Sequence, residues 1–143
     1  MITKTEVAIS EGRTLFPMKT KSAAVLGKTE NVLKIPGKGN KLGRKITKGK
    51  WKGYKIFLLT LEERATCPAS CFHWETCYGN NMPFATRYHV DEHLERRMWS
   101  ELITLQRKNP HGFAIRLHIL GDFCSVEYVE FWRKALNAFP ALH

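Results

Sequence analysis

The alternation of hydrophobic and polar positions becomes regular only after about residue 54. Residues 55–61 are apolar except for Lys55 and Thr60, which predicts a strand with both faces buried, as in a parallel sheet. Residues 113–120 place Phe113 and alternate apolar side chains on one face and polar side chains on the other, which predicts a second strand. Each strand is followed by a loop and then by a helical pattern.

Two segments have the periodicity of amphipathic helices. In residues 85–108 the apolar positions recur at helical spacing: Val90, Leu94, Met98, Leu102 and Leu105. The sequence from Asn109 to Gly112 ends this helix. Ser125 is a suitable N-cap for the second helix, and Pro140 ends it. The apolar face of the second helix is expected at Val129, Trp132, Leu136 and Phe139.

These elements follow one another as strand, loop, helix, strand, loop, helix, an order typical of α/β proteins with a parallel sheet. We therefore expect a partial (βα) barrel-like domain over residues 54–143. A basic and partly irregular N-terminal extension precedes it over residues 1–53, with a turn at residues 36–40. Two strands make a thin sheet, so either the N-terminal segments add strands or the chain is a fragment of a longer protein. We favour the fragment.

The composition favours a cytoplasmic protein without a membrane partner. Hydrophobic residues make up 43% of the chain, which is enough for a core, but no apolar run is long enough to cross a bilayer. The N-terminus lacks the apolar segment of a secretory signal and carries Lys4 and Glu6 instead.

Positive charge is concentrated in the N-terminal part of the chain. The net charge is +10, and between Glu30 and Glu62 there are nine Lys and Arg residues and no acidic residue. The simplest interpretation of the stretch from Lys34 to Lys55 is a solvated basic loop or hairpin. The alternative is a contact with nucleic acid or another polyanion, to which Trp51 could contribute by stacking.

Three of the four cysteines lie close together, in the loop after the first strand. Cys67, Cys71 and Cys77 have the spacing C-x3-C-x5-C. A tight cluster of this kind in a cytosolic chain usually binds metal or takes part in redox chemistry, and thiolates are the usual ligands of iron–sulfur clusters. We therefore expect an iron–sulfur cluster on this loop. Cys124, which follows the second strand, is a weaker candidate for a fourth ligand.

Zinc is the alternative metal. Cys67 and Cys71 followed by His89 and His93 give C-x3-C and H-x3-H, which lie within the spacings of zinc sites. His89 and His93 would share one face of the helix expected over residues 85–108. The simpler interpretation is that both histidines are ordinary, partly buried side chains beside the apolar face of that helix.

The end of the second strand is a candidate ligand-binding segment. Arg116, His118 and, just beyond them, Asp122 are expected on the face opposite the apolar side chains, approaching the end of the sheet that carries the cysteine loop. Gly121 allows a close approach of the backbone to a ligand, and Asp122 can accept hydrogen bonds from an amine or a hydroxyl. The alternative is a half-exposed strand with solvated Arg116 and His118.

Two segments of the second half of the chain carry a resemblance. They are Thr66-Cys67-Pro68 to Cys77-Tyr78-Gly79-Asn80, and Arg116-Leu117-His118 to Gly121-Asp122-Phe123 with Ser125, Glu127, Tyr128 and Trp132 beyond. These residues resemble the phage gene-product-88-like family of uncharacterised phage and bacterial proteins. More distantly, the pattern is similar to radical S-adenosylmethionine enzymes, which carry three cysteines after the first barrel strand and a glycine-rich acidic motif after the second. Their usual loop is C-x3-C-x2-C, whereas the last gap here has five residues.

The similarity to radical S-adenosylmethionine enzymes implies cofactors and site residues. It implies that Cys67, Cys71 and Cys77 hold a 4Fe–4S cluster with one iron open to S-adenosylmethionine. It also implies that Gly121 and Asp122 contact the methionine amino group of that cofactor. The implied activity is a radical reaction started by an electron from the reduced cluster, and no catalytic residue is assigned.

The competing functional hypothesis is a nucleic-acid-binding module rather than an enzyme. In this hypothesis the stretch from Lys34 to Lys55 grips the phosphates, and zinc acts as a structural staple. A cluster predicts a brown, oxygen-sensitive protein, whereas a zinc staple predicts a colourless protein that unfolds when a chelator removes the metal.

Overall fold

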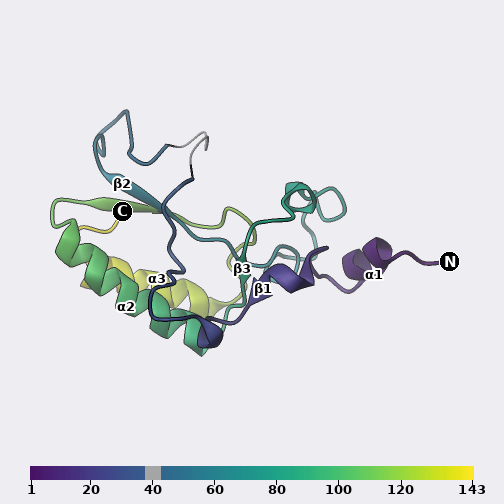
Figure 1. Cartoon of the computed structure of the whole chain (residues 1–143). Helices are drawn as coiled ribbons and strands as arrows, with labels where there is room; N and C mark the ends of the chain where they lie inside the picture. Colours follow the sequence, from purple (N-terminus) through teal and green to yellow (C-terminus); the bar gives the residue numbers. More distant parts are fainter. Residues whose placement is uncertain (38–42) are drawn as a thin grey trace.

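The computed structural model describes residues 1–37 and 43–143, so Lys38, Lys41 and most of the turn expected at residues 36–40 lie outside the described residues. Within the described ranges the fold is a mixed α/β structure with three α-helices and two small parallel sheets (Figure 1). The helices and strands are α1 (Lys4–Ser10), β1 (Thr20–Lys21), β2 (Lys55–Leu58), β3 (Arg87–Tyr88), α2 (Glu92–Lys108), β4 (Phe113–Arg116) and α3 (Val126–Ala138). Single 3-10 turns lie at Pro17–Lys19, Ala23–Val25 and Tyr78–Asn81.

The predicted parallel pairing is confirmed. β2 pairs in parallel with β4, with Lys55 opposite Phe113, and β1 pairs in parallel with β3. A parallel bridge between Leu61 and Tyr88 joins the chain just after β2 to β3, and Leu142 pairs in parallel with Phe113. The segments therefore lie side by side in the order β1, β3, β2, β4 and the residues around Leu142. Across the described residues these strands do not close into a barrel.

The N-terminal part of the chain covers the outer edge of β2. Antiparallel bridges join Lys34 to Leu58 and Lys45 to Lys55, on the side of β2 opposite to β4. An uncovered strand edge presents unpaired N–H and C=O groups, so these bridges satisfy groups that would otherwise require water or another chain. β1 also comes from this part of the chain.

Helix α2 begins at Glu92, so the predicted start near residue 85 is wrong. Asp91 has an extended backbone, and its carboxylate accepts the N–H of Leu94 at 2.8 Å, which makes it the N-cap. The residues before it include β3, which pairs with β1. This pairing replaces the helix that the sequence predicted for the residues before Asp91. His89 therefore lies outside the helix and does not share a helix face with His93. The predicted end at Asn109 is confirmed.

Helix α3 has the predicted ends but a different buried face. Ser125 accepts the N–H of Tyr128 at 3.1 Å as the N-cap, and Pro140 follows the helix. The buried side chains of this face are Tyr128, Trp132, Ala135 and Phe139. Val129 and Leu136 are exposed, so the prediction is wrong for them. The helix is rotated so that the larger aromatic rings of Tyr128 and Trp132 enter the core.

Strand β4 ends at Arg116, earlier than the predicted end at residue 120. His118 has a φ of 62°, in the left-handed region, which interrupts the alternation of a strand. Arg116, His118 and Asp122 are therefore not presented on one strand face, contrary to the prediction. His118 turns instead toward α3, where its Nε2 is hydrogen-bonded to the hydroxyl of Tyr128 at 2.9 Å.

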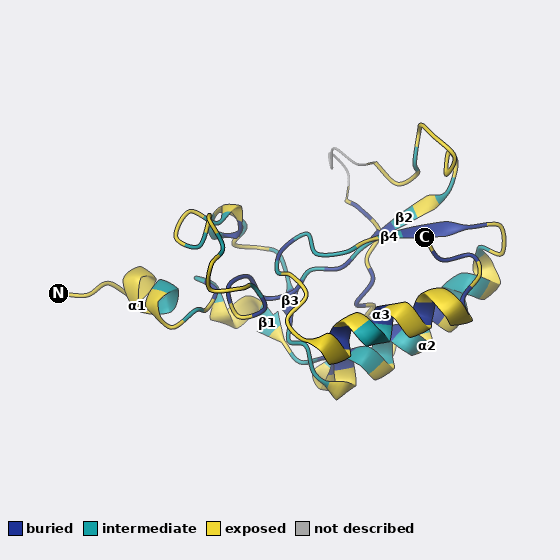
Figure 2. Cartoon of the chain, turned by 180° about the vertical axis from the view of Figure 1, so that it is seen from behind, coloured by how far each residue is buried: buried dark blue, intermediate teal, exposed yellow. Residues whose placement is uncertain are grey.

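The hydrophobic core lies between the strands and the two long helices. Figure 2 shows the buried faces of α2 and α3 turned toward the strands and toward each other, with exposed faces outward. Leu94, Met98 and Leu102 from α2 are fully buried, and the ring of Trp99 packs on that of Phe139 with centroids 4.9 Å apart. No helix among the described residues is both long and apolar enough to span a membrane.

Candidate metal centre

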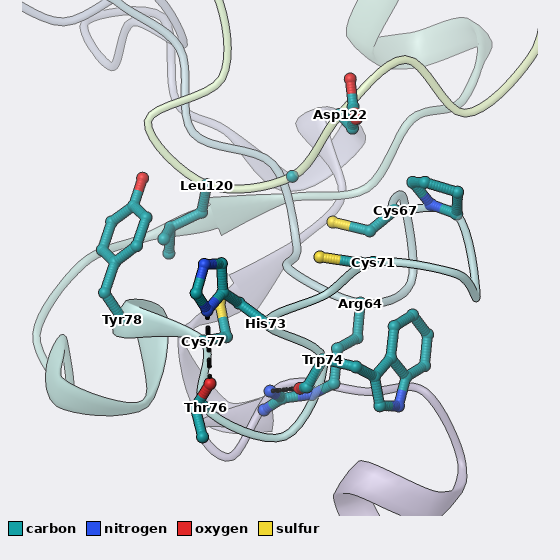
Figure 3. Close-up of a pocket in the computed structure, with 12 residues that line it drawn as sticks. Arg64, Cys67, Cys71, His73, Trp74, Thr76, Cys77, Tyr78, Leu120 and Asp122 are labelled. Atoms are coloured by element: carbon teal, nitrogen blue, oxygen red, sulfur yellow. Dashed lines mark hydrogen bonds between the residues drawn. The ribbon is translucent and has the colours of Figure 1, made fainter.

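The three clustered cysteines line one cavity of about 570 Å³ (Figure 3). Cys67 and Cys71 come from the loop after β2, and Cys77 immediately precedes the 3-10 turn Tyr78–Asn81. The opposite wall is formed by residues that follow β4: Leu120, Gly121 and Asp122. All three thiols are free, and none is part of a disulfide. Two loops that follow adjacent parallel strands therefore enclose the cavity between them.

Tight turns bring the sulfur atoms to the same side of the loop. The N–H of Cys71 donates to the carbonyl of Pro68 at 3.0 Å, and the N–H of Trp74 donates to the carbonyl of Cys71 at 3.1 Å. In Figure 3 the sulfur atoms of Cys67 and Cys71 point in the same direction, toward the part of the cavity where His73 and Cys77 lie.

The Cys67 thiol is in an environment that disfavours its thiolate. Burial raises the pKa of Cys67, the backbone hydrogen bond from Arg64 lowers it, and the neighbouring groups Cys71, Cys77 and Asp122 raise it. The direction is the one expected when acidic groups crowd one partly desolvated cavity. A bound metal cation would instead lower the pKa of the thiol, because a metal ion deprotonates a coordinating thiol.

Two further side chains in the cavity were not singled out by sequence reasoning. His73 lies between Cys71 and Cys77 in the sequence, and its Nδ1 is 3.5 Å from the hydroxyl of Thr76. Tyr78 lines the cavity as well, and burial raises its pKa while the nearby charge of Arg116 lowers it. The sequence did contain one feature that could have identified His73 as a cavity residue, namely its position between Cys71 and Cys77.

The Gly121–Asp122 segment is held against the first loop by a hydrogen bond to Thr66 and by close packing at Gly121. The N–H of Asp122 donates to the hydroxyl of Thr66 at 3.2 Å, and the N–H of Phe123 donates to the Asp122 carboxylate at 2.7 Å. Gly121 has a φ of 86°, and a Cβ at this position would overlap the Thr66 hydroxyl and lie 2.7 Å from Cβ of Leu61. Glycine is therefore required here by the close approach of the two loops.

Arg64 supports the cysteine loop through hydrogen bonds, and the sequence analysis did not identify it. Its side chain is buried, and its guanidinium donates to the carbonyl of Arg13 at 2.7 Å, to the carbonyl of Trp74 at 2.9 Å and to the amide oxygen of Asn80 at 2.7 Å. The indole N–H of Trp74 donates to the carbonyl of Ile9 at 3.1 Å, which ties α1 to the same loop. Arg64 thus fixes the chain between Cys71 and Cys77.

A second buried arginine holds the far end of the loop. Arg87 pairs with Glu63 at 3.1 Å, and it donates to the carbonyl of Gly79 at 2.8 Å and to the carbonyls of Met82 and Ala85 at 2.7 Å. Single-sequence reasoning treats such residues as solvated, because Arg and Glu are almost never fully buried unless they are paired.

The structure separates the histidines from the cysteines. Neither His89 nor His93 lines the cysteine cavity. Nδ1 of His89 lies 3.8 Å from the buried carboxylate of Glu62, and Nε2 of His93 lies 3.9 Å from Glu92 on the first turn of α2. Within the described residues there is no group of three or more His, Cys, Asp and Glu side chains arranged to hold a metal ion, so the C-x3-C and H-x3-H set is not assembled.

The other candidates also lie outside the cavity lining. Arg116 is exposed at the end of β4, and His118 packs on Phe123 with ring centroids 4.8 Å apart. Cys124 is exposed. Of the residues predicted from the sequence, the structure thus brings together Cys67, Cys71 and Cys77 with Gly121 and Asp122.

No family model, curated protein or solved structure matches the chain.

Proposed function

We propose that the chain binds an iron–sulfur cluster through Cys67, Cys71 and Cys77. The observation that carries the proposal is the shared cavity, which three free thiols line at the carboxyl end of the adjacent parallel strands β2 and β4. α/β folds place their ligand sites at this end of the sheet, because the loops there leave a crevice between adjacent strands.

The residues present fit such a group in donor type and in support. Thiolates are the usual ligands of these clusters, and the cavity of about 570 Å³ is large enough for a ligand bigger than one ion. Each thiolate of a cluster binds a different iron atom, so the sulfur atoms need not converge at the distances required by a single ion. Arg64 holds the chain at Trp74, between Cys71 and Cys77, and Arg87 holds it at Gly79, just after Cys77.

The second part of the proposal concerns a cofactor in the same cavity. The similarity to radical S-adenosylmethionine enzymes suggests this cofactor, and Gly121 and Asp122 line the same cavity as the cysteines. Asp122 would accept hydrogen bonds from the methionine amino group, while the backbone at Gly121 would allow its close approach. A bound, reduced 4Fe–4S cluster would supply the electron. We assign His118 a positioning role, because it joins the segment after β4 to Tyr128.

Anaerobic purification followed by iron and sulfide analysis and a visible spectrum tests the cluster. We expect a brown protein with iron and sulfide in equal amounts. The variant with Cys67, Cys71 and Cys77 all changed to Ala should be colourless, whereas Cys124→Ala should retain the colour. A colourless wild-type protein with one zinc per chain after anaerobic reconstitution with iron and sulfide would overturn the proposal. Equilibrium dialysis of S-adenosylmethionine against wild type and Asp122→Ala tests the cofactor separately.

A nucleic-acid-binding module is the second candidate, and one observation favours it. The rings of Trp51 and Tyr54 lie 5.3 and 5.4 Å from that of His143, and the ammonium of Lys50 lies 5.1 Å over the Trp51 ring. Of the two rings only that of Trp51 is exposed, and an exposed aromatic ring beside lysines is a combination that binds single-stranded nucleic acid. The neighbouring exposed lysines are Lys45, Lys48, Lys52 and Lys55.

A further inference from the structure

A second hollow, of about 790 Å³, runs along α2 on the side of the covered edge of β2. Its walls come from three places: the segment from Lys28 to Ile35, the strand β2 and the exposed face of α2. It shares no lining residue with the cysteine cavity. It is therefore separate from the cysteine cavity, and the iron–sulfur proposal does not use it.

This groove carries a strong excess of positive charge. Its charged lining residues are one carboxylate, Glu101, and five cations: Lys28, Lys34, Lys55, Arg97 and Lys108. The carboxylate is already occupied, because it accepts the N–H groups of Val32 and Leu33 at 2.9 Å each and lies 3.4 Å from the guanidinium of Arg97. It is thus a structural anchor for the N-terminal segment and leaves little negative charge to offset the lysines.

Among the residues that the structure describes, the lysines of the groove have no acidic partner at ion-pair distance. Arg97 is held by the carbonyls of Gly27 and Glu30 as well as by Glu101. By contrast, no carboxylate of the described residues lies within ion-pair distance of Lys28, Lys34, Lys55 or Lys108. Four unpaired ammonium groups around one hollow attract an anion with more than one charge.

Lys34 is exposed at its surface, but burial of part of its side chain affects its charge. Its ammonium lies 5.5 Å over the ring of Tyr88, and its pKa is lowered first by burial and then by the charge of Lys21, with Glu30 and Glu101 acting in the opposite direction. A charge that is partly desolvated and near another cation gains more from an anionic partner than a fully solvated lysine does.

The floor of the groove is apolar, unlike that of a plain phosphate site. Leu33 and Phe57 are nearly fully buried and line it together with Leu105 and Ile35. Polar groups suited to hydrogen bonds surround this floor: Asn31, Ser100, Thr104 and Asn109. Small-molecule sites of this size are typically apolar with a few convergent polar groups. A suitable ligand has a flat apolar body, hydrogen-bonding edges and several negative charges.

We infer that this groove binds a nucleoside triphosphate, with the base on Leu33 and Phe57 and the phosphates among Lys28, Lys34, Lys55 and Lys108. The inference goes beyond the proposed function. It is tested on the chain as purified, with the iron content measured in the same sample. If nucleotide binding fails, the cluster proposal still stands, and if the cluster is absent, the nucleotide site can still be tested.

Isothermal titration calorimetry with four probes tests the site: ATP, GTP, inorganic triphosphate and adenosine, at one fixed salt concentration. We expect at least one nucleotide to bind more tightly than both inorganic triphosphate and adenosine. Only the nucleotide can contact the apolar floor with its base and the lysines with its phosphates at the same time. The double variant K34E/K55E should weaken that binding by about tenfold or more. The matched control K4E/K134E changes the net charge equally on residues outside the groove.

A groove-filling variant separates this site from general charge attraction. Ser100→Trp places a large ring in the groove from the exposed side of α2, and it should abolish nucleotide binding. Ile103→Trp adds a similar ring at an exposed position of the same helix outside the groove and should leave binding unchanged. Equal weakening by K4E/K134E, unchanged binding in Ser100→Trp, or inorganic triphosphate binding as tightly as the nucleotides would each overturn the inference.

Discussion

Arg87 and Glu63 form an ion pair in which both side chains are buried, with exposed fractions of 0% and 1% and an Nε–Oε1 distance of 3.1 Å. Three further N–H groups of the same guanidinium donate to the carbonyls of Gly79, Met82 and Ala85. A Cβ on Gly79 would overlap the Glu63 carboxylate, so the loop can approach the pair only as glycine. The pair therefore fastens the end of the cysteine loop to β3.

Replacing Arg87 by Met should destabilise the fold strongly. Removing one partner of a buried ion pair leaves an uncompensated charge and typically costs about 3–5 kcal/mol. Urea denaturation should show a lower free energy of unfolding, and the purified variant should retain less iron because Gly79 lies two positions after Cys77. Arg133→Ala, which removes an exposed pair with Glu130, should leave the denaturation midpoint unchanged. An unchanged midpoint in Arg87→Met would contradict the buried pair.

Replacing Gly121 by Ala should disturb the cavity wall through both conformation and space. The left-handed backbone costs a non-glycine residue about 1–2 kcal/mol. Overlap with Thr66 and Leu61 adds about 1–3 kcal/mol, as in other overpacked sites. Gly53→Ala is a matched control, because Gly53 has a similar φ of 90° with nothing within 4 Å of its added Cβ. Equal destabilisation of the two variants, measured by urea denaturation, would rule out the close approach at Gly121.

The burial of His118 should make stability dependent on pH. Burial lowers the pKa of His118 below its ordinary 6.5, although the charge of Asp122 raises it. Below pH 6.5 the unfolded chain therefore binds a proton more readily than the folded chain, so stability falls as the pH falls through this range. His118→Gln keeps a polar partner for Tyr128 without this titration. We expect the stability difference between wild type and His118→Gln to shrink from pH 7.5 to pH 5.5, measured by urea denaturation at each pH; a constant difference would exclude His118.

Charge reversal within the basic stretch from Lys34 to Lys55 tests the nucleic-acid alternative. Lys48, Lys50 and Lys52 are exposed, and changing all three to Glu should weaken retention on single-stranded DNA. If each lysine contacts a phosphate, the log–log dependence of affinity on salt should become shallower by about 2. A triple reversal at Lys4, Lys19 and Lys134 is the control. If both triple variants lose retention on DNA equally, the binding depends on net charge alone and Lys48, Lys50 and Lys52 have no specific role.

Much of the candidate site could be predicted from the sequence. Cys67, Cys71 and Cys77 stand after one predicted strand, and Gly121 and Asp122 stand after the next. Since neighbouring parallel strands end at the same edge of a sheet, their loops meet there. The supporting residues Arg64, Arg87 and Glu63 could not be predicted in this way. The burial of Arg87 depends on Glu63, 24 residues earlier in the chain, and nothing local in the sequence marks either residue as buried.

The presence of the two central strands and the two long helices follows from the sequence, because hydrophobic periodicity and capping are local properties. β2, α2, β4 and α3 are all present, with the N-cap at Ser125 and the stop at Asn109 as predicted. Contacts between distant segments set where α2 begins, where β4 ends and which face of α3 is buried. The strands β1 and β3 have two residues each, and they exist only through pairing with each other across the chain. Non-local pairing of this kind leaves no periodic signal, since its free energy comes from contacts that form only when the chain has folded.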